Sequence, residues 1–105
     1  MAYYKLDLKK GDLVENEAKP GSANGKKFAV IMKGGQIYVL DGTCTHEGGP
    51  LFDGHIDGNE LICPWHSGAY FLESGKADEN TPWVTDVKRY NCRVDELTGD
   101  LEIEM

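Results

Sequence analysis

Two short pairs of metal-binding residue types constrain this 105-residue chain more than any other feature. Cys44 and His46 frame one segment, Cys63 and His66 frame another, and 16 residues separate the pairs. Donors this close in sequence can reach a common centre from one tight loop, and the long intervening segment lets a second loop approach from the opposite side. We therefore predict a closed metal site whose ligands are Cys44, His46, Cys63 and His66.

The donor types leave two candidates for the metal. Thiolate and imidazole suit zinc or an iron–sulfur cluster, whereas calcium and magnesium prefer oxygen ligands. Zinc folds usually pair like ligands within a turn, Cys with Cys and His with His, but here each loop offers one of each. This mixture favours a [2Fe-2S] cluster with both cysteines on one iron and both histidines on the other. A structural zinc-binding module remains the alternative.

The two loops read C-T-H and C-P-W-H, and in this the chain resembles a Rieske-type ferredoxin. Leu51, Gly54 and Gly58 also stand where that family commonly carries Leu and Gly between its loops, and the likeness runs from about Phe28 to Val94. The resemblance implies that Cys44 and Cys63 ligate a buried iron, while His46 and His66 ligate an outer iron near the surface.

The same resemblance implies one [2Fe-2S] cluster and a soluble one-electron carrier between a reductase and an acceptor such as an oxygenase. No catalytic site is expected, because an oxygenase would add a mononuclear iron held by two histidines and a carboxylate, and His55 is the only spare histidine. If the site holds an iron–sulfur cluster, the alternative function is that of a small redox subunit of a larger enzyme, such as a nitrite reductase small subunit.

Residues after the second histidine bear on the reduction potential. High-potential Rieske proteins carry a Ser two residues and a Tyr four residues after it, where this chain has Gly68 and Tyr70. Tyr70 therefore occupies the place of a hydrogen-bond donor to a cluster sulfur, unless Ser67 is an insertion and Phe71 takes that place instead. We also expect Trp65, Tyr38, Phe52 and Phe71 to form apolar walls around the cluster and Trp83 to cover the same face.

The predicted fold is all-β: a small antiparallel β-sandwich or barrel with a cluster-binding subdomain made of two loops, about residues 42–72, in a single domain spanning 1–105. Apolar runs at 28–32 and 36–40 flank Gly34-Gly35, which predicts a tight hairpin. Shorter strands are expected at 55–56, 61–62, 69–72 and 101–103. Segment 16–27 contains Pro20 and Gly21 and is expected to be a surface loop.

Charge bears on the partners. Residues 34–75 hold six acids and no Lys or Arg, which argues against nucleic acid and favours docking to a basic patch on a redox protein. No stretch approaches 18 apolar residues and the N-terminus lacks a signal pattern, so we expect no membrane anchor and a cytoplasmic protein. Cys92, the third cysteine, is expected to be a half-buried strand residue in a reducing compartment.

Overall fold

The described residues of the chain, 2–45 and 47–105 of a computed structural model, form ten strands and two single-turn 3-10 helices. No helix among them is long and apolar enough to cross a membrane. The elements are β1 (Tyr3–Lys9), η1 (Lys10–Asp12), β2 (Glu17–Ala23), β3 (Lys26–Lys33), β4 (Gln36–Asp41), η2 (Leu51–Asp53), β5 (His55–Asp57), β6 (Glu60–Ile62), β7 (Ala69–Phe71), β8 (Arg89–Tyr90), β9 (Cys92–Val94) and β10 (Asp100–Glu104).

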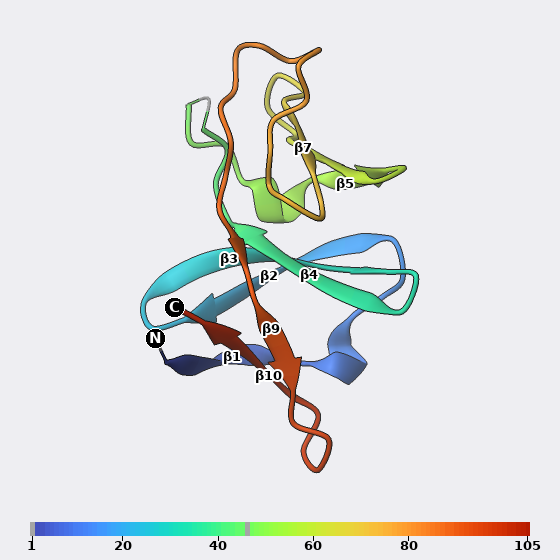
Figure 1. Cartoon of the computed structure of the whole chain (residues 1–105), viewed down its shortest axis with the longest axis vertical. Coiled ribbons are helices and arrows are strands. Elements are labelled where there is room, and N and C mark those ends of the chain that lie inside the picture. The colour runs from blue at the N-terminus through green and yellow to red at the C-terminus, as the bar shows by residue number, and fades with distance from the viewer. Residues whose placement is uncertain (1, 46) are drawn as a thin grey trace.

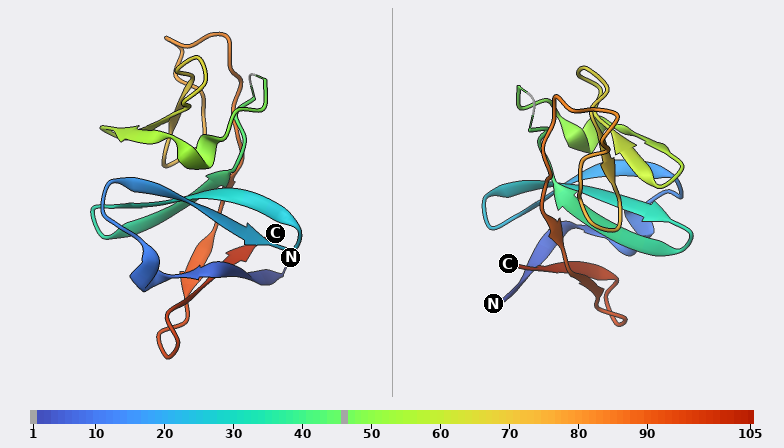
Figure 2. Two further views of the ribbon diagram at one scale, coloured as in Figure 1. Left: turned by 180° about the vertical axis from the view of Figure 1, so that it is seen from behind. Right: turned by 45° about the horizontal axis from the view of Figure 1, so that its top comes forward.

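The strands form two sheets in which every paired strand is antiparallel. A seven-stranded sheet has the order β7-β6-β5-β2-β3-β4-β8, and a three-stranded sheet has the order β1-β10-β9. The β2-β3-β4 part of the larger sheet crosses the middle of the molecule, with the three-stranded sheet on one side and β5, β7 and their loops on the other (Figures 1 and 2). This arrangement confirms the predicted all-β, antiparallel fold.

The hairpin of β3 and β4 is confirmed, and it explains why residues 28–31 are apolar without alternation. Gly34 and Gly35 turn the chain with φ of 61° and 77°, values that residues without a Cβ adopt at no steric cost. Phe28 and Val30 of β3 pack toward the three-stranded sheet, whereas Ala29 and Ile31 pack toward the other side. Both faces of this hairpin are therefore buried, so its sequence lacks the polar positions of a half-exposed strand.

Two separate cores result, one on each side of the central hairpin. The core against the three-stranded sheet contains Leu6, Ala23, Phe28, Val30, Val39, Tyr90, Leu101 and Ile103. The core on the opposite side contains Ala29, Ile31, Leu40, Cys44, Leu51, Leu61, Cys63, Tyr70, Leu72, Val84 and Val87. Because two of the predicted ligands belong to the second core, that side of the hairpin carries the candidate site.

The expectation of a surface loop over residues 16–27 is wrong, because Glu17–Ala23 forms strand β2. Ser22 donates its N–H to Asp7 Oδ1 of β1 at 2.7 Å. The N–H groups of Ser22 and of every second residue of β2 therefore point away from β3. Pro20 lies two residues earlier, so its missing N–H would also point away from β3. That edge of β2 is paired with β5 only at Glu17, so the proline removes no ladder hydrogen bond. Gly21 is required by packing: a Cβ there would lie 2.9 Å from Val30 Cγ2.

Strand β1 was not predicted, although its sequence carries the signal. Tyr4, Leu6 and Leu8 alternate with polar residues, which is typical of a half-buried strand. Their side chains pack into the core of the three-stranded sheet, where β1 pairs with β10. The sequence thus contained a strand that its charged residues, Lys5 and Lys9, obscured.

Two carboxyl groups, those of Glu60 and Asp78, share a hydrogen bond. The hydrogen bond with Asp78, together with burial, raises the pKa of Glu60 from 4.5 to about 7, and Asp57 adds to the effect. The N–H of Asn80 chiefly lowers the pKa of Asp78, so that this group is already charged. The folded protein therefore holds a proton on Glu60 that the unfolded chain releases, and stability falls as pH rises from about 4.5 to about 7.

We expect Glu60→Gln to remove this loss, because an amide donates a hydrogen bond to Asp78 at every pH. The parent should lose on the order of 1 kcal/mol across this window, since partial exposure of Glu60 weakens the effect. Melting temperatures measured at several pH values between about 5 and 8 test this. Glu73→Gln, at an exposed position on the same side, should retain the slope of the parent, and an unchanged slope in Glu60→Gln would contradict the assignment.

Candidate metal centre

The first ligand loop leaves the hairpin where β4 ends. Gly42 follows at once, and its backbone lies so close to β3 that a Cβ would meet Lys27 O at 2.6 Å. The loop then closes on itself, with the Cys44 N–H donating to Gly49 O at 2.8 Å. Glu47 and Gly48 turn the chain with φ of 59° and 67°. Cys44 is thereby fixed at the base of a tight loop rather than at its tip.

The second ligand loop follows β6 and is closed in the same way. The Cys63 N–H donates to Gly68 O at 2.8 Å. Between them His66 and Ser67 both adopt left-handed backbone conformations, with φ of 66° and 57°. Such angles are unfavourable for residues with side chains and are held only where surrounding contacts demand them. A Cβ at Gly68 would lie 2.6 Å from Val84 Cγ1, so only glycine fits at the end of this loop.

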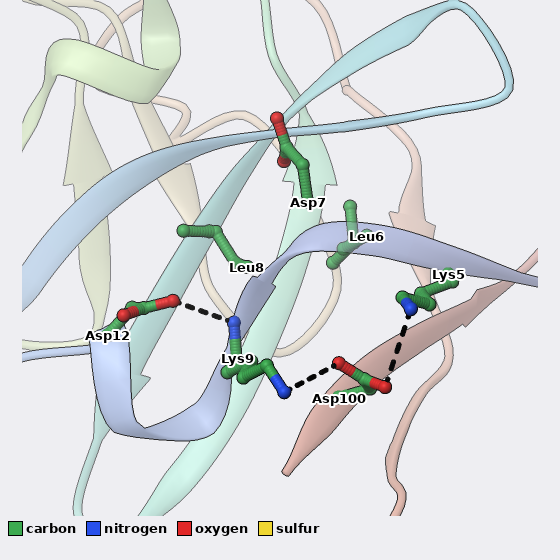
Figure 3. Close-up of a pocket in the computed structure, with 7 residues that line it drawn as sticks. All are labelled: Lys5, Leu6, Asp7, Leu8, Lys9, Asp12 and Asp100. Carbon is green, nitrogen blue, oxygen red and sulfur yellow. Dashed lines mark hydrogen bonds and ion pairs between the residues drawn. The ribbon is translucent and has the colours of Figure 1, made fainter. Parts of the chain in front are cut away.

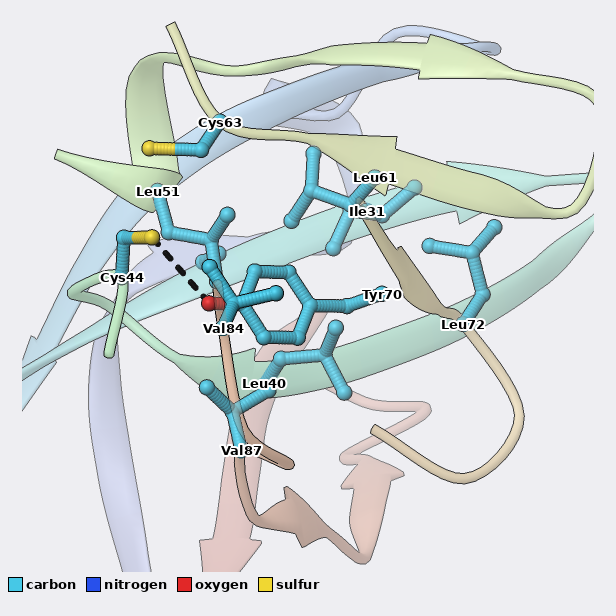
Figure 4. Packing of buried hydrophobic residues seen from close by; sticks show 11 residues of the cluster. Ile31, Leu40, Cys44, Leu51, Leu61, Cys63, Tyr70, Leu72, Val84 and Val87 are labelled. Atoms are coloured by element: carbon cyan, nitrogen blue, oxygen red, sulfur yellow. Dashed lines mark hydrogen bonds between the residues drawn. The ribbon is translucent and has the colours of Figure 1, made fainter. Parts of the chain in front are cut away.

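The two thiols lie in the core beneath these loops. Cys44 is 3% exposed and Cys63 is 1% exposed. Burial, with the neighbouring Cys44 thiol adding to it, raises the pKa of Cys63 to about 11. Figure 4 shows the two sulfur atoms on the same side of the hydrophobic core. The structure thus brings together the two predicted cysteine ligands, which have 18 residues between them in the sequence.

Tyr70 of β7 settles the alignment that the sequence left open. Its hydroxyl lies 3.1 Å from Cys44 Sγ (Figure 4), and the residue is fully buried. Phe71 points to the other face of the strand and is 40% exposed, so Ser67 does not displace the tyrosine. Burial and the adjacent Cys44 raise the pKa of Tyr70 to about 12, so the phenol keeps its proton for donation.

The histidines occupy a different environment from the thiols. The His66 side chain is 52% exposed, and its Nδ1 lies 3.9 Å from Glu47 Oε2 of the first loop. His46, the fourth predicted ligand, lies outside the described residues. The spare histidine, His55, is exposed on β5 as expected for a solvated strand residue.

A third segment, residues 81–85, holds both ligand loops, and sequence reasoning identified only part of it. Trp83 donates its indole N–H to His66 O at 3.1 Å, which ties it to the second loop as expected for a residue covering this face. Thr85 N–H donates to Thr45 Oγ1 at 2.9 Å, and Thr45 Oγ1 lies 3.0 Å from Thr85 O. No spacing rule links residues 40 positions apart, so the roles of Thr45 and Thr85 could not be read from the sequence.

Other expectations about the surroundings have mixed outcomes. Trp65 is 47% exposed and, like Phe71, does not form a buried wall around the thiols. Tyr38 and Phe52 are partly buried and pack against the core that holds the thiols, and Leu51, Leu61 and Val84 belong to it. Cys92 is half-buried in β9, as predicted, and burial raises the pKa of its thiol to about 11.

A hollow in the three-stranded sheet lies away from the thiols and has a different character. It is lined by β1 and β10, and its Lys5 and Lys9 ammonium groups lie 3.6 and 3.5 Å from the two carboxylate oxygens of Asp100 (Figure 3). No cysteine or histidine lines it. The ligand types therefore converge only at the opposite side of the hairpin, among the described residues.

The donor set on that side fits an iron–sulfur group. Two buried thiols approach each other, a phenol lies against one sulfur, and an exposed imidazole belongs to the same loop as Cys63. A sulfur-rich centre needs thiolates shielded from water, and its charge is stabilised by hydrogen bonds to sulfur. The arrangement supplies both features.

Comparison with known proteins agrees with this chemistry. Residues 4–91 match the Rieske [2Fe-2S] domain. The ferredoxin component of naphthalene 1,2-dioxygenase/salicylate 5-hydroxylase systems from Ralstonia sp. is 33% identical over 93 residues, which cover 89% of this chain and 88% of that protein. Among solved structures, the Sphingomonas yanoikuyae B1 ferredoxin has a TM-score of 0.81 at 26% identity, covering 92% of this chain and 93% of that one.

A putative NADH-dependent nitrite reductase small subunit from Mycobacterium tuberculosis shares the fold, with a TM-score of 0.81 and 14% identity over 95% of this chain and 92% of that one. Similarity at this low identity concerns the fold alone. The match to the domain and the identity to the Ralstonia ferredoxin component go further. This chain belongs to the Rieske [2Fe-2S] domain family and is a Rieske-type ferredoxin whose cofactor is one [2Fe-2S] cluster.

Proposed function

We propose that this ferredoxin carries single electrons to an oxygenase, with Cys44, His46, Cys63 and His66 as the four cluster ligands. The observation that supports the ligand set is the pairing of the buried Cys44 and Cys63 thiols, with the exposed His66 in the same loop as Cys63. When bound, a [2Fe-2S] cluster accepts and releases one electron without gaining or losing ligands. A zinc-binding module, the alternative from ligand spacing, does not agree with the family to which the chain belongs.

The protein's own residues divide the work around this group. Cys44 and Cys63 hold its buried side away from water, and Tyr70 donates a hydrogen bond to Cys44 Sγ. His66 brings the site to the surface, where a partner can approach, and Trp83 holds the carbonyl of His66 in place. These roles suit an electron carrier, and the relatives named as ferredoxin components support a non-catalytic role.

Relatives are named as components of dioxygenase systems, and the charge distribution suits docking to such a partner. Residues 42–86, which bear the ligand loops and the segment that covers them, contain eight acids and only one lysine, Lys76. Glu47 stands directly beside His66. An acidic surface around an exposed ligand fits an oxygenase face with a basic patch, because opposite charges steer the encounter.

Replacing His66 tests the ligand set, and His55 provides the matched control. We expect His66→Ala to abolish the visible spectrum of the cluster, whereas His55→Ala, at an exposed strand position, should leave it unchanged. Absorption and EPR spectra before and after dithionite, with iron and sulfide assays on the same samples, measure the outcome. A parent protein containing zinc and no iron, or a His66→Ala variant with the parent spectrum, would refute the proposed ligation.

Replacing Tyr70 tests the hydrogen bond to Cys44. Because the bond stabilises negative charge on sulfur more in the reduced state, Tyr70→Phe should lower the reduction potential. A difference of about 1 kcal/mol between oxidation states corresponds to roughly 40 mV for one electron. Protein-film voltammetry measures the shift, and Tyr38→Phe, whose hydroxyl instead contacts Gln36, is the control. An unchanged potential in Tyr70→Phe would remove this role.

Salt dependence tests the docking surface. Raising ionic strength from about 0.01 M to about 1 M shortens the Debye length from about 30 Å to about 3 Å. The second-order rate of electron delivery to the naphthalene dioxygenase of the related Ralstonia system should therefore fall by at least about tenfold. Glu47→Gln should lower the rate at low salt, whereas Glu96→Gln, in the turn at the opposite end, should not. A rate independent of salt would contradict charge-steered docking.

The alternative role as a subunit of a nitrite-reductase-like enzyme has the fold similarity as its only support. Purification from the native source distinguishes the two. A carrier should elute as the free chain and should reduce an oxygenase in solution, whereas a subunit should co-purify with a larger protein. Co-purification in constant proportion would overturn the carrier proposal.

A further inference from the structure

We propose that Thr45, the residue between Cys44 and His46, is a positioning residue that tunes the reduction potential through Tyr70. Its hydroxyl forms the middle link of a hydrogen-bond chain that begins at the Thr85 backbone and ends at Cys44 Sγ. This inference rests on the proposed ligation by Cys44. It adds a residue that contacts the cluster only through another side chain.

The distances define the chain. Thr85 N lies 2.9 Å from Thr45 Oγ1, Thr45 Oγ1 lies 3.0 Å from the Tyr70 hydroxyl, and that hydroxyl lies 3.1 Å from Cys44 Sγ. The Thr45 N–H also points at the Tyr70 oxygen, at 3.1 Å. A backbone N–H can only donate. The Thr85 N–H therefore donates to Thr45 Oγ1, and the Thr45 N–H donates to the Tyr70 oxygen.

Proton counting then decides what Tyr70 does. Its oxygen accepts from the Thr45 N–H, and its single proton must go to Cys44 Sγ or to Thr45 Oγ1. A thiolate is the stronger acceptor because it is charged, so the tyrosine proton belongs on sulfur when the cluster is bound. The Thr45 hydroxyl is then free to donate to the Tyr70 oxygen, which aligns all three links toward the sulfur.

A competing arrangement is also defined by the structure. Thr45 Oγ1 lies 3.0 Å from Thr85 O, so its proton can be given to that carbonyl instead. In that arrangement Thr45 would accept from Tyr70 and draw its proton away from sulfur. The two arrangements predict opposite effects of removing the hydroxyl. We infer the first, because added negative charge on sulfur favours donors oriented toward it, and each link polarises the next.

Thr45→Val, which removes the hydroxyl at nearly constant volume, tests the inference. Loss of two links, each strengthening the final bond by about 10–30%, predicts a potential lowered by roughly a sixth to two fifths of the Tyr70→Phe shift. Thr45→Ser retains a hydroxyl and should restore the parent potential. In a Tyr70→Phe background the Thr45→Val change should have no further effect, because the link to sulfur is already gone.

The outcomes separate this proposal from the proposed function. Iron content, sulfide content and the spectrum of the parent test ligation, and the potentials of variants with intact spectra test Thr45. A potential unchanged in Thr45→Val would leave Thr45 with a purely structural role, and a raised potential would establish the competing arrangement. Either result overturns the inference. Should Thr45→Val fail to load a cluster, Thr45→Ala compared with Thr45→Ser isolates the same hydroxyl.

Discussion

Burial of both faces of the β3-β4 hairpin is the constraint on which the rest of this structure depends. Neither face can meet water, so each must be covered: one by the three-stranded sheet and the other by β5 to β7 with the ligand loops. The hydrophobic effect therefore favours packing of the ligand loops onto the hairpin, where Cys44 and Cys63 join its core. Gly42 then fixes where the first loop departs, because only a residue without Cβ fits against Lys27 O.

The register of strands β6 and β7 determines where one of the predicted ligands lies. Leu61 of β6 pairs with Tyr70 of β7, and Cys63 follows Leu61 by two residues. The same pairing that sets the position of Cys63 thus places the tyrosine hydroxyl against Cys44 from the other loop. A slip of one residue would turn Tyr70 to the surface and Phe71 inward. The Cys63 thiol and the phenol are accordingly positioned by one ladder, whereas Cys44 is positioned by its own loop.

The parts that could be predicted from sequence are those whose signals are local. The Cys-His motifs that indicated the family and the hairpin at Gly34-Gly35 each lie within a few residues, and chemistry and turn geometry limit what such patterns can form. Strand β2 was not predicted, because residues such as Pro20 and Gly21 usually end strands. Their tolerance depends on which edge of β2 is open and on the side chain of Val30, facts that exist only after folding.

The site shows the same division between local and distant information. The choice between Tyr70 and Phe71 depended on one residue of register, which the sequence left open and the β6-β7 pairing decides. The Thr45-Thr85 contact joins segments 40 residues apart with side chains common in any loop, so no pattern marks it. Residues that touch a ligand loop through another residue are, in general, the ones that sequence spacing cannot reveal.

The exposed surface near His66 is consistent with a partner that must both bind and leave. Trp65 and Trp83 of this region are each nearly half exposed, and Glu47 lies 3.9 Å from the imidazole. Aromatic side chains at the middle of an interface provide most of its contact energy, whereas rim charges mainly accelerate association. Redox encounters bury little area and dissociate quickly.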